Sequence, residues 1–202
     1  MVTPKAPFKI GFLLSGGGRT LENIVEYLST RPELGEVVGV VSDRKDAYGL
    51  QRAENHGIPN AVLPCRSRHV EGDSEAIFEW LERHDANIVL LGGFLRLLRV
   101  PPRWHQRVLN VHPSLIPKYS GKGFYGDRVH QAVIDANETE SGCTIHFVDN
   151  IYDHGPILRQ ERVPVESGDT PESLAARVFE AECHAYPAAL EELAGNDRGH
   201  PS

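Results

Sequence analysis

An amide and an imidazole stand two residues apart in the segment LNVHPS, residues 109–114. Its apolar residues are typical of a buried strand, and residues i and i+2 of a strand project to the same face. Asn110 and His112 therefore point in one direction, and Pro113 ends the strand directly after them. An amide beside an imidazolium suits a developing oxyanion, although a single histidine is more often a structural residue.

Three consecutive glycines follow the first apolar run, in SGGGRT at 15–20. Glycines at the start of a helix let backbone N–H groups approach a phosphate. Gly16 and Gly18 also match the first two glycines of the GxGxxG dinucleotide fingerprint, and Asp43 follows the next strand, so a dinucleotide site is a competing interpretation. The third glycine is replaced by Leu21, which favours a monophosphate.

A third segment, DHGP at 153–156, joins two predicted strands. A carboxylate of Asp153 facing His112 would favour the imidazolium, but Asp and Gly are also ordinary turn residues, and this segment alone favours the turn. Metal-ligand spacings and the GxSxG hydrolase motif are absent from the sequence. Five basic residues in loops or at strand ends are candidates for holding an anionic tail, although each alone is more often a surface charge: Arg66, Arg68, Arg96, Lys118 and Lys122.

The elements that must position these groups alternate in the first half of the chain. Short apolar runs predict strands at 8–14, 37–41, 61–63 and 88–91, and helical spacing of apolar residues predicts helices around 21–28, 48–56 and 77–81. Such alternation indicates an α/β, Rossmann-like fold, with a mostly parallel twisted sheet and helices on both faces. Ligands of such sheets bind beyond the carboxyl ends of the strands, where the three segments lie.

The second half of the chain changes pattern. A helix is predicted at 129–136, and strands at 144–148 and 157–163 are expected to pair antiparallel. A last long helix begins at Pro171, with Thr170 as its cap. We expect a frayed tail at about 195–202 and one domain spanning 1–202, because the composition shows no break or linker.

Charge and composition exclude several classes of function. The 202 residues carry 21 Lys and Arg against 28 Asp and Glu, a net charge of −7, which argues against a nucleic-acid partner. No apolar run approaches the roughly 18 residues of a membrane span, so no membrane partner is expected. Three scattered cysteines indicate a reducing compartment, and we expect a cytoplasmic location.

Together the segments resemble the folate-dependent phosphoribosylglycinamide formyltransferases of purine biosynthesis, in the family's order and over nearly the whole chain. The matching stretches are LSGGG (14–18), VSDRKDAYG (41–49), LGGFLRLL (91–98), NVHPSLIPK (110–118), GCTIHFV (142–148), DHGPIL (153–158) and ECHAYP (182–187). Two departures occur: the family more often has Asn and Ser where this chain has Gly17 and Arg19, and GKGFYG at 121–126 is a variant loop.

The resemblance implies a role for individual residues. The catalytic Asn, His and Asp of the family fall on Asn110, His112 and Asp153. The remaining implied contacts are with the substrate phosphate through Gly18, Arg19 and Thr20, with the acceptor substrate through Pro113 and Glu182, and with the folate through Arg68, Leu95, Arg96, Leu97, Leu98, Asn110 and the loop 148–153.

The resemblance also implies an activity: transfer of the formyl group of 10-formyltetrahydrofolate, a co-substrate, to the amine of glycinamide ribonucleotide, without a metal and by a monomer or homodimer. Competing interpretations are hydrolysis of 10-formyltetrahydrofolate, formyl transfer to another amine, or a nucleotide-binding module of the Rossmann type without catalysis, which would use Asp43 on a ribose.

Overall fold

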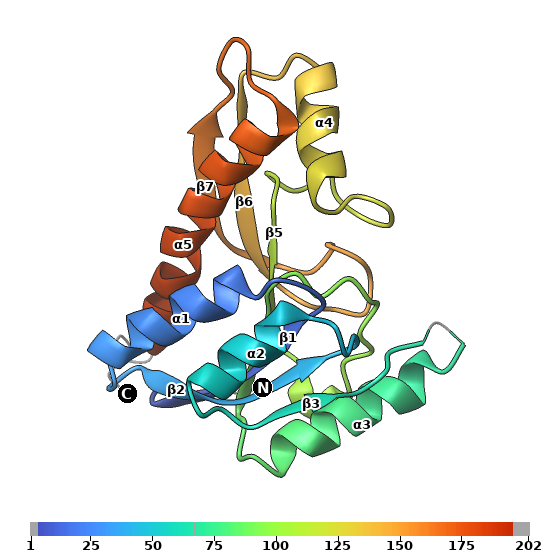
Figure 1. Ribbon diagram of the computed structural model, residues 1–202, viewed down its shortest axis with the longest axis vertical. Helices are drawn as coiled ribbons and strands as arrows, with labels where there is room; N and C mark the ends of the chain where they lie inside the picture. Colours follow the sequence, from blue (N-terminus) through green and yellow to red (C-terminus); the bar gives the residue numbers. More distant parts are fainter. Residues whose placement is uncertain (1–3, 67, 196–202) are drawn as a thin grey trace, which may run out of the picture.

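The strand β1 (Phe8–Leu14) lies inside a seven-stranded sheet (Figure 1). Its sequence of apolar residues, which are buried on both faces of the strand, accounts for this central position. In the computed structural model, which describes residues 4–66 and 68–195, Phe8, Ile10 and Phe12 belong to one hydrophobic cluster and Leu13 to another. Alternate residues of a strand face opposite sides, so this run requires cover on both faces. Helices supply that cover, as predicted.

The sheet order is β3-β2-β1-β4-β5-β6-β7, and the first five of these strands run parallel. This confirms the predicted mostly parallel sheet. The other parallel strands are β2 (Gly35–Ser42), β3 (Asn60–Val62), β4 (Ile88–Leu91) and β5 (Val108–His112).

The two last strands are antiparallel, which confirms the second prediction for the sheet. β6 (Glu140–Phe147) pairs with β5 and with β7 (Ile157–Pro164). In the β5–β6 register Asn110 lies opposite His146, and His112 lies opposite Thr144. β6 begins at Glu140, four residues before the predicted strand at 144–148. Its first residues are polar, so the apolar pattern missed them, but they pair with β7.

One face of the sheet packs against α1 (Arg19–Thr30), α2 (Tyr48–Asn55), α4 (Asp127–Asp135) and α5 (Pro171–Gly195), and the other against α3 (Val70–Glu82) and the short helix η1 (Pro102–Trp104). Within the described ranges no helix is long and apolar enough to cross a bilayer. The expected frayed tail lies outside the described residues except Gly195, which ends α5.

The long helix α5 fixes the sheet near its functional edge. Its start carries the predicted cap: Thr170 Oγ1 accepts a 3.3 Å hydrogen bond from the N–H of Ser173, whose Oγ accepts one from the N–H of Thr170. Further along, the fully buried Tyr186 hydroxyl lies 3.0 Å and 3.1 Å from the carbonyl oxygens of Leu91 and Leu109. Tyr186 thus ties together β4 and β5 just before the residues that they deliver to their carboxyl ends.

Candidate active site

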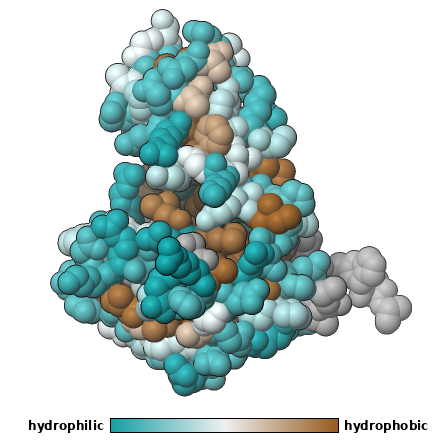
Figure 2. Space-filling view, turned by 90° about the vertical axis from the view of Figure 1, so that its right-hand side faces the viewer, coloured by the Kyte–Doolittle hydropathy of each residue, from teal (hydrophilic) through white to brown (hydrophobic). Residues whose placement is uncertain are grey.

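A cavity of about 610 Å³ opens at the carboxyl ends of β1, β4 and β5. In the sheet, β2 and β3 lie on one side of β1, and β4 and β5 lie on the other, so the strand order reverses next to β1. Ligands of open α/β sheets usually bind at this point. Figure 2 shows a hollow in the middle of one face of the molecule, bordered by apolar surface. The residues lining the cavity include the predicted Gly18, Arg19, Thr20, Leu95, Asn110, His112, Pro113, Asp153 and Glu182.

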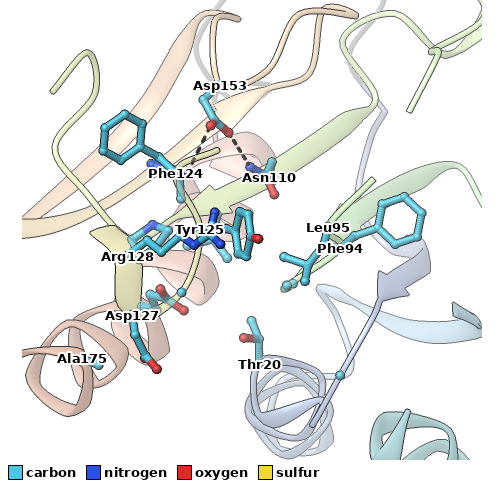
Figure 3. A pocket seen from close by; sticks show the side chains of 18 of the residues that line it. Thr20, Phe94, Leu95, Asn110, Phe124, Tyr125, Asp127, Arg128, Asp153 and Ala175 are labelled. Carbon is cyan, nitrogen blue, oxygen red and sulfur yellow. Dashed lines mark hydrogen bonds and ion pairs between the residues drawn. The ribbon is translucent and has the colours of Figure 1, made fainter. Parts of the chain in front are cut away.

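The three side chains predicted to be catalytic meet in this cavity. Nδ1 of His112 lies 3.4 Å from Oδ2 of Asp153, and Nε2 of His112 donates to the carbonyl oxygen of Tyr119 at 2.8 Å. Nδ2 of Asn110 donates to Oδ1 of the same carboxylate at 3.4 Å (Figure 3), and the N–H of Gly121 donates to Oδ2 at 2.9 Å. Both ring nitrogens of His112 therefore face oxygen acceptors, the environment that a doubly protonated imidazole requires.

A second buried histidine, His146, orients the amide and was missed by sequence reasoning. Its Nδ1 donates to the carbonyl oxygen of Phe147 at 2.9 Å, which leaves Nε2 to accept from Nδ2 of Asn110 at 3.1 Å. Burial lowers the pKa of His146, which keeps the ring neutral and Nε2 free to accept. The available signal was the strand alternation, because His146 shares a face with Asn110 once β5 and β6 pair in this register.

Asp153 reaches His112 on a loop that takes an unusual path. Its own φ is +51°, in the left-handed region that Asp tolerates better than most residues. A Cβ at Gly155 would lie 1.8 Å from the carbonyl oxygen of Phe147, so only glycine lets the loop pass there. The loop is anchored where Oδ1 of Asn150 accepts a 2.5 Å hydrogen bond from the N–H of Val100. Asp153 is therefore both a turn residue and a carboxylate that faces His112, which are the two interpretations of this segment that the sequence offered.

The glycine loop leads into the uncapped start of α1. Gly18 has φ +71°, no side chain caps the helix, and a Cβ on Gly18 would lie 2.6 Å from Cα of Gly49. The first N–H groups of α1 are therefore available to an anion beside the positive end of the helix dipole. The guanidinium of Arg19 lies 4.0 Å from the ring centroid of Phe179 on α5, at the same side of the cavity.

Glu182 of α5 lines the cavity close to Arg19. Burial raises its pKa from 4.5 to about 7, and the nearby positive charge of Arg19 opposes this shift only in part. Near neutral pH the carboxyl group therefore exists in both forms. Glu182 can accept hydrogen bonds from a ligand when it is ionised and can also donate one when it is protonated.

The variant loop 121–126 and the start of α4 form a further part of the wall that the sequence did not place. Phe124, Tyr125 and Arg128 line the cavity, and the Arg128 guanidinium lies 4.9 Å from the Tyr125 ring centroid. Gly121, Gly123 and Gly126 each have a positive φ, so the three glycines of this segment were the available signal for an irregular loop.

The residues predicted to contact folate divide into two groups. Leu95 lines the cavity and is 50% exposed, whereas Leu98 is 2% exposed in the core. The Leu97 carbonyl oxygen accepts a bond from Sγ of Cys65, and Nε of Arg96 pairs with Oδ2 of Asp43 at 2.7 Å. The described cavity lining does not include Arg68, Arg96, Leu97 or Leu98, so their contact with folate stays a prediction.

The described part of the chain contains no group of three or more His, Cys, Asp or Glu side chains placed to hold a metal ion. The cavity offers instead the amide of Asn110, the imidazole of His112 and the carboxylate of Asp153 on one wall, and an uncapped helix start with an arginine on another. Such an arrangement can bind an anionic substrate and stabilise an oxyanion next to a group that transfers protons.

Comparisons with known proteins agree with this geometry. The family model described as formyl transferase matches residues 8–190. The chain is 35% identical to the phosphoribosylglycinamide formyltransferase of Haemophilus influenzae, over 91% of this chain and 85% of the relative. It is also 39% identical to the trifunctional purine biosynthetic protein adenosine-3 of Gallus gallus. That match covers 92% of this chain but only 18% of the length of the relative. The crystal structure of glycinamide ribonucleotide transformylase 1 from Symbiobacterium toebii superposes with a TM-score of 0.84 at 35% identity, covering 94% of this chain and 88% of that one.

Proposed function

Because this chain belongs to the formyl transferase family, we propose that it transfers the formyl group of 10-formyltetrahydrofolate to the amine of glycinamide ribonucleotide. The observation that carries the proposal is the meeting of Asn110, His112 and Asp153 in a cavity that also contains an uncapped helix start. The relative from Haemophilus influenzae and the solved structure from Symbiobacterium toebii, both 35% identical to this chain, are named for formyl transfer to the same acceptor, which supports this part of the proposal.

The acceptor nucleotide fits the side of the cavity formed by α1 and α5. Its phosphate is placed at Gly18, Arg19 and Thr20, where helix N–H groups and one guanidinium offer donors. Arg19 stands where the family more often has Ser, and its position over Phe179 keeps the guanidinium at this wall. The carboxyl group of Glu182 is then available to the sugar or glycinamide part of the substrate.

The formyl folate fits the opposite side, near Leu95 and Tyr152, which are 50% and 37% exposed and line the cavity. Apolar side chains there suit the flat ring system of the folate. Arg96, held by Asp43, and Arg68 are proposed for its anionic tail, with Leu97 and Leu98 shaping the loop that carries Leu95.

The glycinamide amine attacks the formyl carbon of the co-substrate to give a tetrahedral intermediate, which collapses by breaking the bond between the formyl carbon and the folate nitrogen and releases tetrahydrofolate. Asn110 and protonated His112 stabilise the oxyanion that develops on the formyl oxygen, and Asp153 balances the imidazolium charge and helps to move protons between the two nitrogens. The contacts of 3.4 Å are long, as catalytic hydrogen bonds often are before substrate binds, so these donors can turn to a substrate oxygen. Pro113 ends β5 next to them and faces the acceptor.

A dinucleotide-binding module without catalysis is less well supported. Such a module needs the Asp43 carboxylate on a ribose. The Asp43 side chain is 2% exposed, and its Oδ2 pairs with Nε of Arg96, so the carboxylate is not free to bind a ribose.

One formyltransferase domain, a cytoplasmic location and a monomer or homodimer stay predictions.

The proposal is tested by assaying folate-dependent formylation of glycinamide ribonucleotide while measuring hydrolysis of the formyl folate in the same tube. Replacing His112 by Ala should lower kcat by about 10²–10³ with little change in nucleotide affinity, because an oxyanion donor acts mainly in the transition state. His105→Ala, at an exposed position outside the cavity lining, is the matched control. Near-normal turnover of His112→Ala, or hydrolysis without transfer, would contradict the proposal.

A further inference from the structure

A histidine that the proposed reaction does not use lies in the wall of the same cavity. His130 of α4 is 4% exposed and lies between the buried residues Val129 and Val133 of its helix. It is nevertheless one of the residues that line the 610 Å³ space, together with Asp127 and Arg128. Its position therefore combines burial in the fold with access to a bound ligand.

Nδ1 of His130 is buried and has no hydrogen-bond partner among the described residues. Two other buried side-chain atoms share this condition, Oδ1 of Asp43 and Oγ of Ser141, but neither residue lines the large cavity. Leaving a buried polar atom unpaired is costly, so native structures usually provide a partner. Because the ring of His130 lines the ligand cavity, a ligand bound there can supply a hydrogen-bond partner for the imidazole.

The charge state of His130 suits a hydrogen bond rather than an ion pair. Burial lowers its pKa, the neighbouring His112 lowers it further, and Asp127 opposes the shift. A neutral imidazole has one N–H donor and one acceptor nitrogen, so it can bind a group that both donates and accepts. His130 and His112 line the same cavity.

The position of α4 indicates which substrate is involved. Figure 3 shows Asp127, Arg128 and Ala175 on one side of the cavity and Phe94 and Leu95 on the opposite side. Helix α4 thus belongs to the side that α5 shares with the proposed phosphate site, away from the proposed folate side.

We propose that His130 is a substrate-binding residue of the acceptor side, whose uncharged imidazole exchanges a hydrogen bond with the glycinamide end of the nucleotide. This inference rests on the proposed function. It assigns His130 a contact that the Asn110, His112 and Asp153 group does not make, and it gives a role to a buried polar ring on α4.

The test is the affinity of the full chain for glycinamide ribonucleotide, measured by calorimetry without folate. His130→Phe keeps a ring but removes both nitrogens, and we expect it to weaken this binding about tenfold, the worth of one hydrogen bond. His130→Asn, which can still hydrogen-bond, should recover part of the loss. A folate analogue without a transferable formyl group should bind both variants as it binds the parent, and His105→Phe, at the exposed position, should change neither affinity.

A second measurement needs no substitution in the protein that binds. In ¹⁵N spectra of the histidine rings, the His130 signals, identified by their loss in His130→Asn, should shift on adding glycinamide ribonucleotide and stay in place on adding the folate analogue. Unchanged nucleotide affinity in His130→Phe, or His130 signals that do not shift when the nucleotide is added, would overturn the inference while leaving the proposed function intact. Failure of the parent protein to bind the nucleotide would instead overturn the proposed function and the inference with it.

Discussion

Glu182 offers a change whose effect on stability can be worked out from the structure. Glu182→Gln keeps the size of the side chain and removes its charge from the cavity wall. Burial raises the pKa of the carboxyl from 4.5 to about 7. At about 1.36 kcal/mol per pKa unit, this shift corresponds to an upper limit of about 3 kcal/mol by which the ionised carboxylate destabilises the folded state.

The pH window follows from the direction of the shift. Between pH 4.5 and about 7 the folded protein holds a proton on Glu182 that the unfolded chain has released, so the free energy of unfolding falls as the pH rises through this range. Above about pH 7 the destabilisation is complete, and below 4.5 it is absent. Glutamine does not titrate, so Glu182→Gln should match the parent near pH 4.5 and exceed its stability by up to about 3 kcal/mol at pH 8.

The assay is urea unfolding of the ligand-free protein at pH 5 and pH 8. Glu180→Gln, at an exposed position on the same helix, is the matched control and should show no such pH-dependent gain. The same Glu182 variant should bind glycinamide ribonucleotide less tightly, because the carboxylate is proposed to contact it. A variant that is no more stable than the parent at pH 8, or whose gain is equal at both pH values, would refute the reasoning.

Two further predictions concern residues that position the site. Tyr186→Phe removes the fully buried hydroxyl that donates its hydrogen to the carbonyl oxygens of Leu91 and Leu109, so urea unfolding should show a loss of about 1–3 kcal/mol, and an unchanged free energy would contradict this. Gly18→Ala puts a Cβ 2.6 Å from Cα of Gly49 at a φ of +71°, so calorimetry should show weaker binding of phosphate-bearing ligands, whereas Gly72→Ala, with nothing within 4 Å of its Cβ and outside the cavity lining, should bind them normally.

Local patterns in the sequence were sufficient for much of the framework. The apolar run of β1, the Thr170 and Pro171 start of α5 and the antiparallel end of the sheet all follow from short-range rules of burial, capping and alternation. The same rules placed Asn110 and His112 on one face at the end of β5. These features are predictable because the residues that determine them lie within a few positions of one another.

The tertiary structure alone decided which distant groups meet. Asp153 lies 43 residues beyond Asn110 in the chain. The residues of its own segment predict only a turn aspartate, and its contact with His112 depends on the path of the loop in the folded protein. His146 became the partner of Asn110 only through the register of β5 against β6, and Arg96 was drawn to Asp43 rather than into the described cavity lining. Such contacts depend on strand register and on the packing of loops, which are decided by the whole core rather than by neighbours in the chain.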